Sequence, residues 1–78
     1  MRGKKSYVIL TFSTTTEAMK MEALCGQKDI PGRLIPVPGA ISAGCGLCFR
    51  IPDGDYLKHY EKIHSLGVIF EGEIPFDM

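Results

Sequence analysis

Cys45 is the clearest chemical signal in the sequence, because a glycine stands on each side of it, Gly44 and Gly46. Glycine has no side chain, so the sulfur between them is left little covered and backbone N–H groups can approach a bound group. Apolar segments flank this site, and the first of them, 34–38, is interrupted by prolines. The pattern predicts a hairpin that displays a reactive thiol at its tip.

Cys48 stands three residues after Cys45 and completes a C-x-x-C motif. In thioredoxin-like proteins such a motif works at the N-terminus of a helix, whereas the residues that follow here favour a strand. Positions three apart in a strand point to opposite faces and lie roughly 10 Å apart, beyond the reach of a disulfide. Dithiol redox chemistry is therefore a minor alternative, which a bulge at Gly46 would favour.

A zinc site is a further alternative, because His59 and His64 follow the cysteines at nearly the spacing of a two-cysteine, two-histidine site. However, histidines five positions apart lie about 140° around a helix from each other, and a strand would separate the two thiols. We expect no metal site and no cofactor. Cys25 is expected to pack in the core, on the apolar face of a helix.

Composition narrows the class of protein. The chain has 78 residues, which indicates one domain spanning 1–78. Lys plus Arg equal Asp plus Glu, so the formal net charge is zero, which argues against a surface for nucleic acid or for an anionic membrane. No segment approaches the roughly 20 apolar residues of a membrane span. An odd number of cysteines without an export signal predicts thiols in the reducing cytoplasm.

Hydrophobic periodicity predicts an α+β fold. The apolar run 6–12 predicts a buried strand. Thr14 and Glu17 have the spacing of a capping box, so a helix should begin there and either end at Gly26 or fray on to Asp29. A second helix is expected to bury one stripe of side chains, and the last strand to be interrupted by a bulge at Gly72. The expected strands are 6–12, 33–37, 45–51 and 68–70 with 74–76; the expected helices are 15–26 and 54–66, the latter burying Tyr56, Leu57, Tyr60 and Ile63.

The order strand, helix, strand, strand, helix, strand predicts a ferredoxin-like βαββαβ sandwich. Its four-stranded antiparallel sheet would have the order 4-1-3-2, with both helices on one face. In this topology the first helix starts at the same end of the sheet as the hairpin that carries Cys45. The positive end of the helix dipole would then favour the thiolate and stabilise a bound anion. Ser13, Thr14, Ser42 and the N–H groups of Gly44 and Gly46 are the candidate binding groups around Cys45. The alternative stays open that Ser13 and Thr14 only cap a helix and that Cys45 is a small buried residue.

Two groups of residues resemble the small bacterial family described as "putative selenium/sulfur carrier protein-like". They are Phe12-Ser13-Thr14 with Ala18 and Glu22, and Leu34-Ile35-Pro36-x-Pro38-x-x-Ile41-Ser42-x-Gly44-Cys45-Gly46-Leu47. The resemblance covers essentially the whole chain. It implies a carrier, rather than a turnover enzyme, that holds sulfur or selenium on Cys45 and exchanges it with donor and acceptor proteins. Two departures from the family are Gly39, where relatives often have a basic residue, and Cys48, where many have an apolar one.

Two classes of function therefore remain at this point. One is the covalent carrier, and the other is a non-catalytic interaction module that uses the scaffold and an exposed sheet edge. The sequence also leaves a homodimer open. Thiol reactivity separates the two classes, because a carrier needs an exposed Cys45 with a low pKa. We expect Cys45 to be alkylated first, Cys25 last and Cys48 between them.

Overall fold

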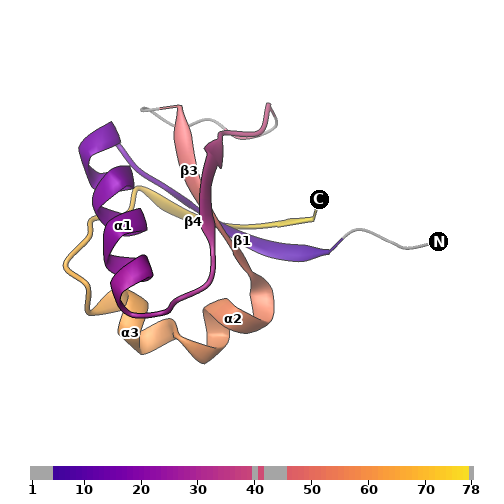
Figure 1. Ribbon diagram of the computed structural model, residues 1–78. Coiled ribbons are helices and arrows are strands. Elements are labelled where there is room, and N and C mark those ends of the chain that lie inside the picture. Colours follow the sequence, from indigo (N-terminus) through magenta and orange to yellow (C-terminus); the bar gives the residue numbers. More distant parts are fainter. Residues whose placement is uncertain (1–4, 40, 42–45, 78) are drawn as a thin grey trace.

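The computed structural model describes residues 5–39, 41 and 46–77. These residues form an α+β fold with four strands and three helices (Figure 1). No described helix is long and apolar enough to cross a membrane. The elements follow in the order β1 (Ser6–Thr11), α1 (Thr15–Gln27), β2 (Arg33–Pro36), β3 (Leu47–Pro52), α2 (Asp53–Lys58), α3 (Tyr60–His64) and β4 (Gly72–Asp77).

The strands form one antiparallel sheet in the order β2-β3-β1-β4. This is the expected order 4-1-3-2 read from the opposite edge, so the predicted arrangement of strands is confirmed. β1 lies inside the sheet because Val8, Ile9 and Leu10 are all buried, and both of its faces are therefore covered. β2 lies at an edge, where a residue without a backbone N–H, such as Pro36, is tolerated.

Strand ends differ from the expected ones by one or two residues. β1 ends at Thr11 and β2 at Pro36, each one residue early, whereas β3 continues to Pro52. β3 begins at Leu47, two residues later than expected, because Gly46 has a φ of +78°, which is a left-handed conformation that a strand does not contain.

α1 continues one residue past Gly26, within the extension toward Asp29 that the sequence allows. It ends at Gln27, and Asp29 then adopts a φ of +56°. The N–H of Ile30 donates to the carbonyl of Cys25 at 2.9 Å, which is the six-to-one bond of a Schellman motif. Aspartate tolerates the left-handed region better than most residues do, so the chain needs no glycine at this turn.

Two short helices, α2 and α3, replace the single helix expected over 54–66. They are separated at His59, whose φ of −107° and ψ of 17° are not helical. A single continuous helical face therefore does not run through α2 and α3. Tyr56 and Ile63 are buried as expected, but Leu57 is 69% exposed and Tyr60 is 46% exposed.

β4 is a single uninterrupted strand, and the bulge expected at Gly72 is wrong, because every residue of β4 pairs in register with β1. Residues 68–70 are not part of it. Contacts with α1 hold this connection instead: Glu17 accepts a hydrogen bond from the N–H of Ile69 at 3.2 Å, and the Lys20 ammonium donates to the carbonyl of Gly67 at 3.3 Å.

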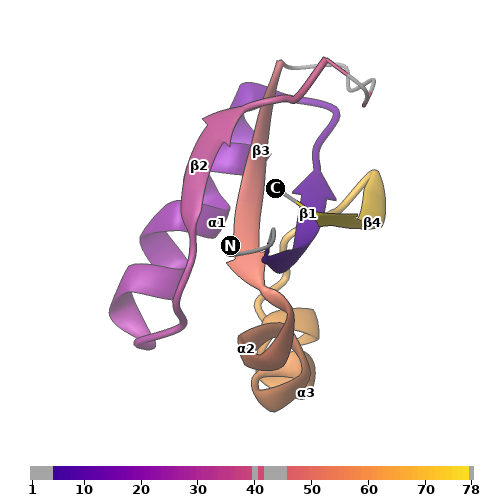
Figure 2. The same ribbon diagram turned by 90° about the vertical axis from the view of Figure 1, so that its right-hand side faces the viewer.

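The sheet has an inner face, which the helices cover, and an outer face. All three helices bury side chains in one core on the inner face. Figure 2 looks on to the outer face, with α1 behind the sheet. Residues of this core are Val8, Leu10, Phe49 and Ile51 from the sheet, Ala18, Met21 and Cys25 from α1, Tyr56 from α2 and Ile63 from α3.

Candidate functional site

The predicted site falls at the end of the sheet where β1 leads into α1 and where the chain turns between β2 and β3 (Figure 1). Strand pairing defines this end. Thr11, the last residue of β1, lies opposite Cys48 of β3 and opposite Gly72, the first residue of β4. Pro36 at the end of β2 lies opposite Leu47 at the start of β3. The start of α1 and the start of β3 are therefore at the same end of the sheet, as the topology predicts.

Thr14 forms the N-terminal cap of α1, as the sequence predicts. Its backbone is extended, and its hydroxyl oxygen accepts a hydrogen bond from the N–H of Glu17 at 3.3 Å. Ser13 and Thr14 are both exposed. A helix N-terminus carries N–H groups without partners within the helix and about half a positive charge. This end of α1 can therefore attract an anion or a thiolate from the solvent side.

Gly46 lies at the same end and is exposed. Its carbonyl accepts a hydrogen bond from the N–H of Val37 at 3.1 Å, which extends the β2–β3 pairing by one further bond. A Cβ atom at this position would meet nothing within 4 Å, so the φ of +78°, rather than lack of space, favours glycine here. Three other predicted site residues, Ser42, Gly44 and Cys45, lie outside the described residues.

Cys25 and Cys48 are both buried, at 2% and 0% exposure. Cys25 belongs to the main core, as expected, and burial raises the pKa of its thiol to about 11. Cys48 points to the outer face, between Thr11 and Ile35 on the neighbouring strands. Burial therefore slows the reaction of both thiols with reagents from solvent. The exposed fractions of the two side chains give no reason for Cys48 to react faster than Cys25.

The strand expected from residue 45 onward begins later in this structure. β3 begins at Leu47, and Gly46 has a left-handed backbone. The distance between the sulfurs of Cys45 and Cys48 therefore does not follow from strand geometry.

Within residues 5–39, 41 and 46–77, no group of three or more His, Cys, Asp or Glu side chains is arranged to hold a metal ion. His64, one of the two histidines in the zinc-like spacing, is engaged elsewhere. Its Nε2 lies 2.8 Å from a Glu73 carboxylate oxygen, and its Nδ1 lies 2.8 Å from the carbonyl oxygen of Tyr60. A ring with both nitrogens so engaged has no lone pair directed at a metal.

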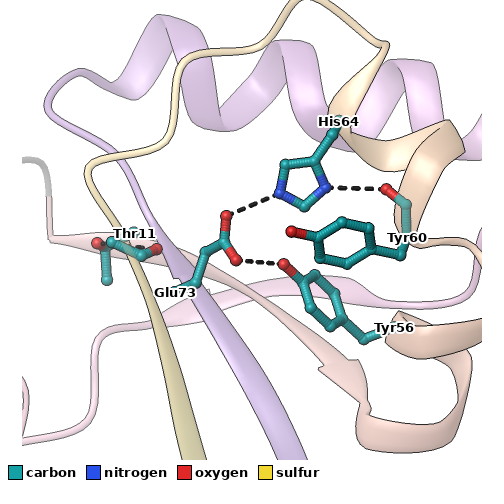
Figure 3. A network of polar contacts seen from close by, with 6 residues as sticks. Thr11, Tyr56, Tyr60, His64 and Glu73 are labelled. Carbon is teal, nitrogen blue, oxygen red and sulfur yellow. Dashed lines mark hydrogen bonds and ion pairs between the residues drawn. The ribbon is translucent and has the colours of Figure 1, made fainter.

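A polar network around Glu73 is the feature that the sequence analysis missed (Figure 3). The Tyr56 hydroxyl donates to one carboxylate oxygen of Glu73, and His64 bonds to the other. The Tyr60 ring lies against the His64 ring, with centroids 4.1 Å apart. Only the four-residue spacing of Tyr60 and His64 is visible in the sequence, since the other partners are brought together by the fold.

Protonation holds this network together. Both nitrogens of His64 face acceptors, so both donate when the ring is an imidazolium. Burial alone would lower the pKa of His64, but the bonds to the Tyr60 carbonyl and to Glu73 outweigh it and raise the pKa. The hydrogen bond from Tyr56 is the main reason that the pKa of Glu73 is lowered, and His64 adds to it. The network joins α2, α3 and β4, and because its groups are already paired we interpret it as structural.

Comparison with known proteins identifies the family. A family model described as "Putative Se/S carrier protein-like" matches residues 7–75, from β1 into β4. The chain belongs to this family. The matched segment includes the cap residue Thr14, Gly46 and Cys45, so the resemblance seen in the sequence is confirmed as family membership. Searches of the curated proteins and of the solved structures find no match.

Proposed function

We propose that this member of the Se/S carrier-like family carries sulfur or selenium on the thiol of Cys45. The observation that carries the proposal is the placement of Gly46, the residue bonded to Cys45, at the same exposed end of the sheet as the N-terminus of α1. Family membership over residues 7–75 supports it. The fold that we propose for the single domain 1–78 is ferredoxin-like, which agrees with the strand order of the sheet.

Transfer proceeds by exchange of a sulfur–sulfur bond. The Cys45 thiolate attacks the terminal sulfur of a cysteine persulfide on a donor protein. A new bond forms between Cys45 and that sulfur as the donor's sulfur–sulfur bond breaks, and the donor's thiolate leaves. The terminal sulfur is transferred together with its hydrogen, so the exchange needs no separate oxidant. An acceptor's thiolate removes the sulfur by the same step, and selenium follows the same scheme.

The surrounding groups serve the anionic forms in this exchange. The attacking species is the thiolate, and the positive end of the α1 dipole stabilises it. We assign Ser13, Thr14 and Ser42 as hydroxyl donors to the bound group, and Gly44 and Gly46 as backbone donors. The carrier works in the cytoplasm, where thiols stay reduced, and its partners are the donor and acceptor proteins.

Intact-mass spectrometry tests this proposal. The protein is incubated with a cysteine desulfurase and cysteine under anaerobic conditions, next to the variants Cys45→Ser and Cys25→Ser. The wild type and Cys25→Ser should each gain the mass of sulfur, and Cys45→Ser should gain none. An equal gain in Cys45→Ser would refute the proposal. No gain in the wild type, while the desulfurase turns over, would also refute it.

A further inference from the structure

The outer face of the sheet carries positive charge next to apolar side chains. Strand alternation directs Arg33 of β2 and Arg50 of β3 to this face, and the two are direct cross-strand neighbours. In the same row lie Ile9 of β1, which is fully buried, and Ile74 of β4, which is partly exposed. No described helix packs on this face (Figure 2). Its outward residues on the described strands are Arg33, Ile35, Cys48, Arg50, Pro52, Tyr7, Ile9, Thr11, Gly72, Ile74 and Phe76. Ile9, Thr11 and Cys48 are buried, so the accessible part of this face is formed by the other residues of the set.

Negative charge is absent from this set of residues. The two carboxylates on the described strands, Glu73 and Asp77, alternate to the opposite side of β4. Among the described residues the one ion pair is His64 with Glu73, so neither Arg33 nor Arg50 has a carboxylate partner there. In a chain whose formal net charge is zero, the outer face is therefore a locally cationic surface.

The positions of the arginines are partly fixed. The Arg50 guanidinium lies over the Tyr7 ring, 4.7 Å from its centroid. Stacking of this kind holds a guanidinium in place while leaving its N–H groups able to bind a carboxylate. Arg33 is exposed at the edge strand next to it. Like charges placed directly opposite each other repel, so an anion bound between them would relieve that repulsion.

We propose that the outer face docks an acidic protein partner, whose carboxylates pair with Arg33 and Arg50 while its apolar side chains contact Ile74 and Phe76. Charge complementarity selects this partner. Nucleic acid fits less well, because single strands bind through aromatic rings with open faces and Arg50 already lies over Tyr7. The proposal concerns a different face from the thiol site and holds whether or not Cys45 carries sulfur.

An NMR titration of the whole chain, labelled with ¹⁵N, tests the proposal. The probe is a short peptide rich in glutamate and leucine. Its twin with lysine in place of every glutamate, and a single-stranded oligothymidine, are titrated in parallel. The glutamate peptide should give saturable shifts at amides of β2, β3, β1 and β4 and not of α1, and they should weaken as salt is added. The other two probes should give none.

Two double variants complete the test. Arg33→Glu with Arg50→Glu should weaken binding of the glutamate peptide at least about tenfold. Lys58→Glu with Lys62→Glu changes the net charge equally on exposed positions of α2 and α3 and should leave binding unchanged. If the arginine reversal unfolds the chain, Arg33→Gln with Arg50→Gln replaces it. Shifts that appear on the helices, equal loss in both double variants, or outer-face shifts with oligothymidine alone would each overturn the proposal.

Discussion

Gly32→Ala is the substitution for which the structure predicts the largest loss of stability. Gly32 precedes β2 with a φ of +139°, a backbone conformation that residues other than glycine rarely adopt. A Cβ atom there would lie inside contact distance of Phe49 Cε2, 2.7 Å from Phe49 Cζ and 2.9 Å from the carbonyl oxygen of Arg50. The Phe49 ring is 1% exposed in the core, so it cannot move aside without disturbing its neighbours.

The expected loss in the free energy of unfolding is the sum of a packing penalty and a backbone penalty. Overpacking a core costs about 1–3 kcal/mol, and a non-glycine residue in a strained backbone conformation costs about 1–3 kcal/mol more. The free energy of unfolding should therefore fall by about 2–6 kcal/mol. A domain of 78 residues has about 4–12 kcal/mol in total, so Gly32→Ala is expected to leave the protein marginally folded.

Two other glycines provide matched controls. Gly46→Ala meets nothing within 4 Å, so only its φ of +78° should cost stability, about 1–2 kcal/mol. Gly26→Ala lies inside α1 with open space around it and should stabilise the protein by about 0.5–1 kcal/mol. Urea unfolding followed by far-ultraviolet circular dichroism measures all three. If Gly32→Ala lost no more than Gly46→Ala, the predicted clash with Phe49 would be wrong.

Three further predictions concern the titrating groups and the site. The pKa of His64 is raised, so its contribution to stability is complete below its ordinary value of 6.5 and is lost as pH rises through the folded pKa. The pKa of Glu73 is lowered, so its contribution to stability is present above pH 4.5 and is lost as pH falls through the folded pKa. Thermal unfolding measured across pH should show a loss of stability in each direction, and His64→Gln should abolish the loss at rising pH. Thr14→Ala should cost about 1 kcal/mol of helix capping and slow alkylation of Cys45, measured by peptide mass spectrometry. An unchanged alkylation rate would show that the N-terminus of α1 does not activate the Cys45 thiol. Cys25, whose thiol pKa is about 11, should label only as fast as the protein unfolds, and fast labelling in native buffer would contradict its place in the core.

Local signals explain what the sequence predicted correctly. The cap at Thr14 needs only residues within one turn, and the apolar run of β1 together with the proline of β2 places one strand inside the sheet and the other at its edge. α1 ends one residue beyond Gly26 because Asp29, rather than Gly26, adopts the left-handed turn. The break between α2 and α3 at His59 was missed because neither glycine nor proline marks it.

Long-range pairing explains what the sequence could not show. Glu73 meets Tyr56 and His64 only because β4 returns beside β1, and no spacing in the chain encodes that meeting. Arg33 and Arg50 look like separate solvated strand ends in the sequence, and the β2–β3 register makes them neighbours. The topology alone predicts that the start of α1 lies at the end of the sheet where β3 begins, and the sheet has this arrangement. The assignment of the site residues stays a prediction.

The most direct test of the carrier function is the amount of transferable sulfur on each single-cysteine variant. Wild type, Cys25→Ser, Cys45→Ser and Cys48→Ser are loaded with a desulfurase and cysteine, separated from the donor, and assayed for cyanide-labile sulfur per chain. Loss of this sulfur in Cys45→Ser alone, with wild-type amounts in the other two variants, is the predicted result. Wild-type amounts in Cys45→Ser, or equal loss in all three variants, would contradict the assignment of Cys45 as the carrier thiol.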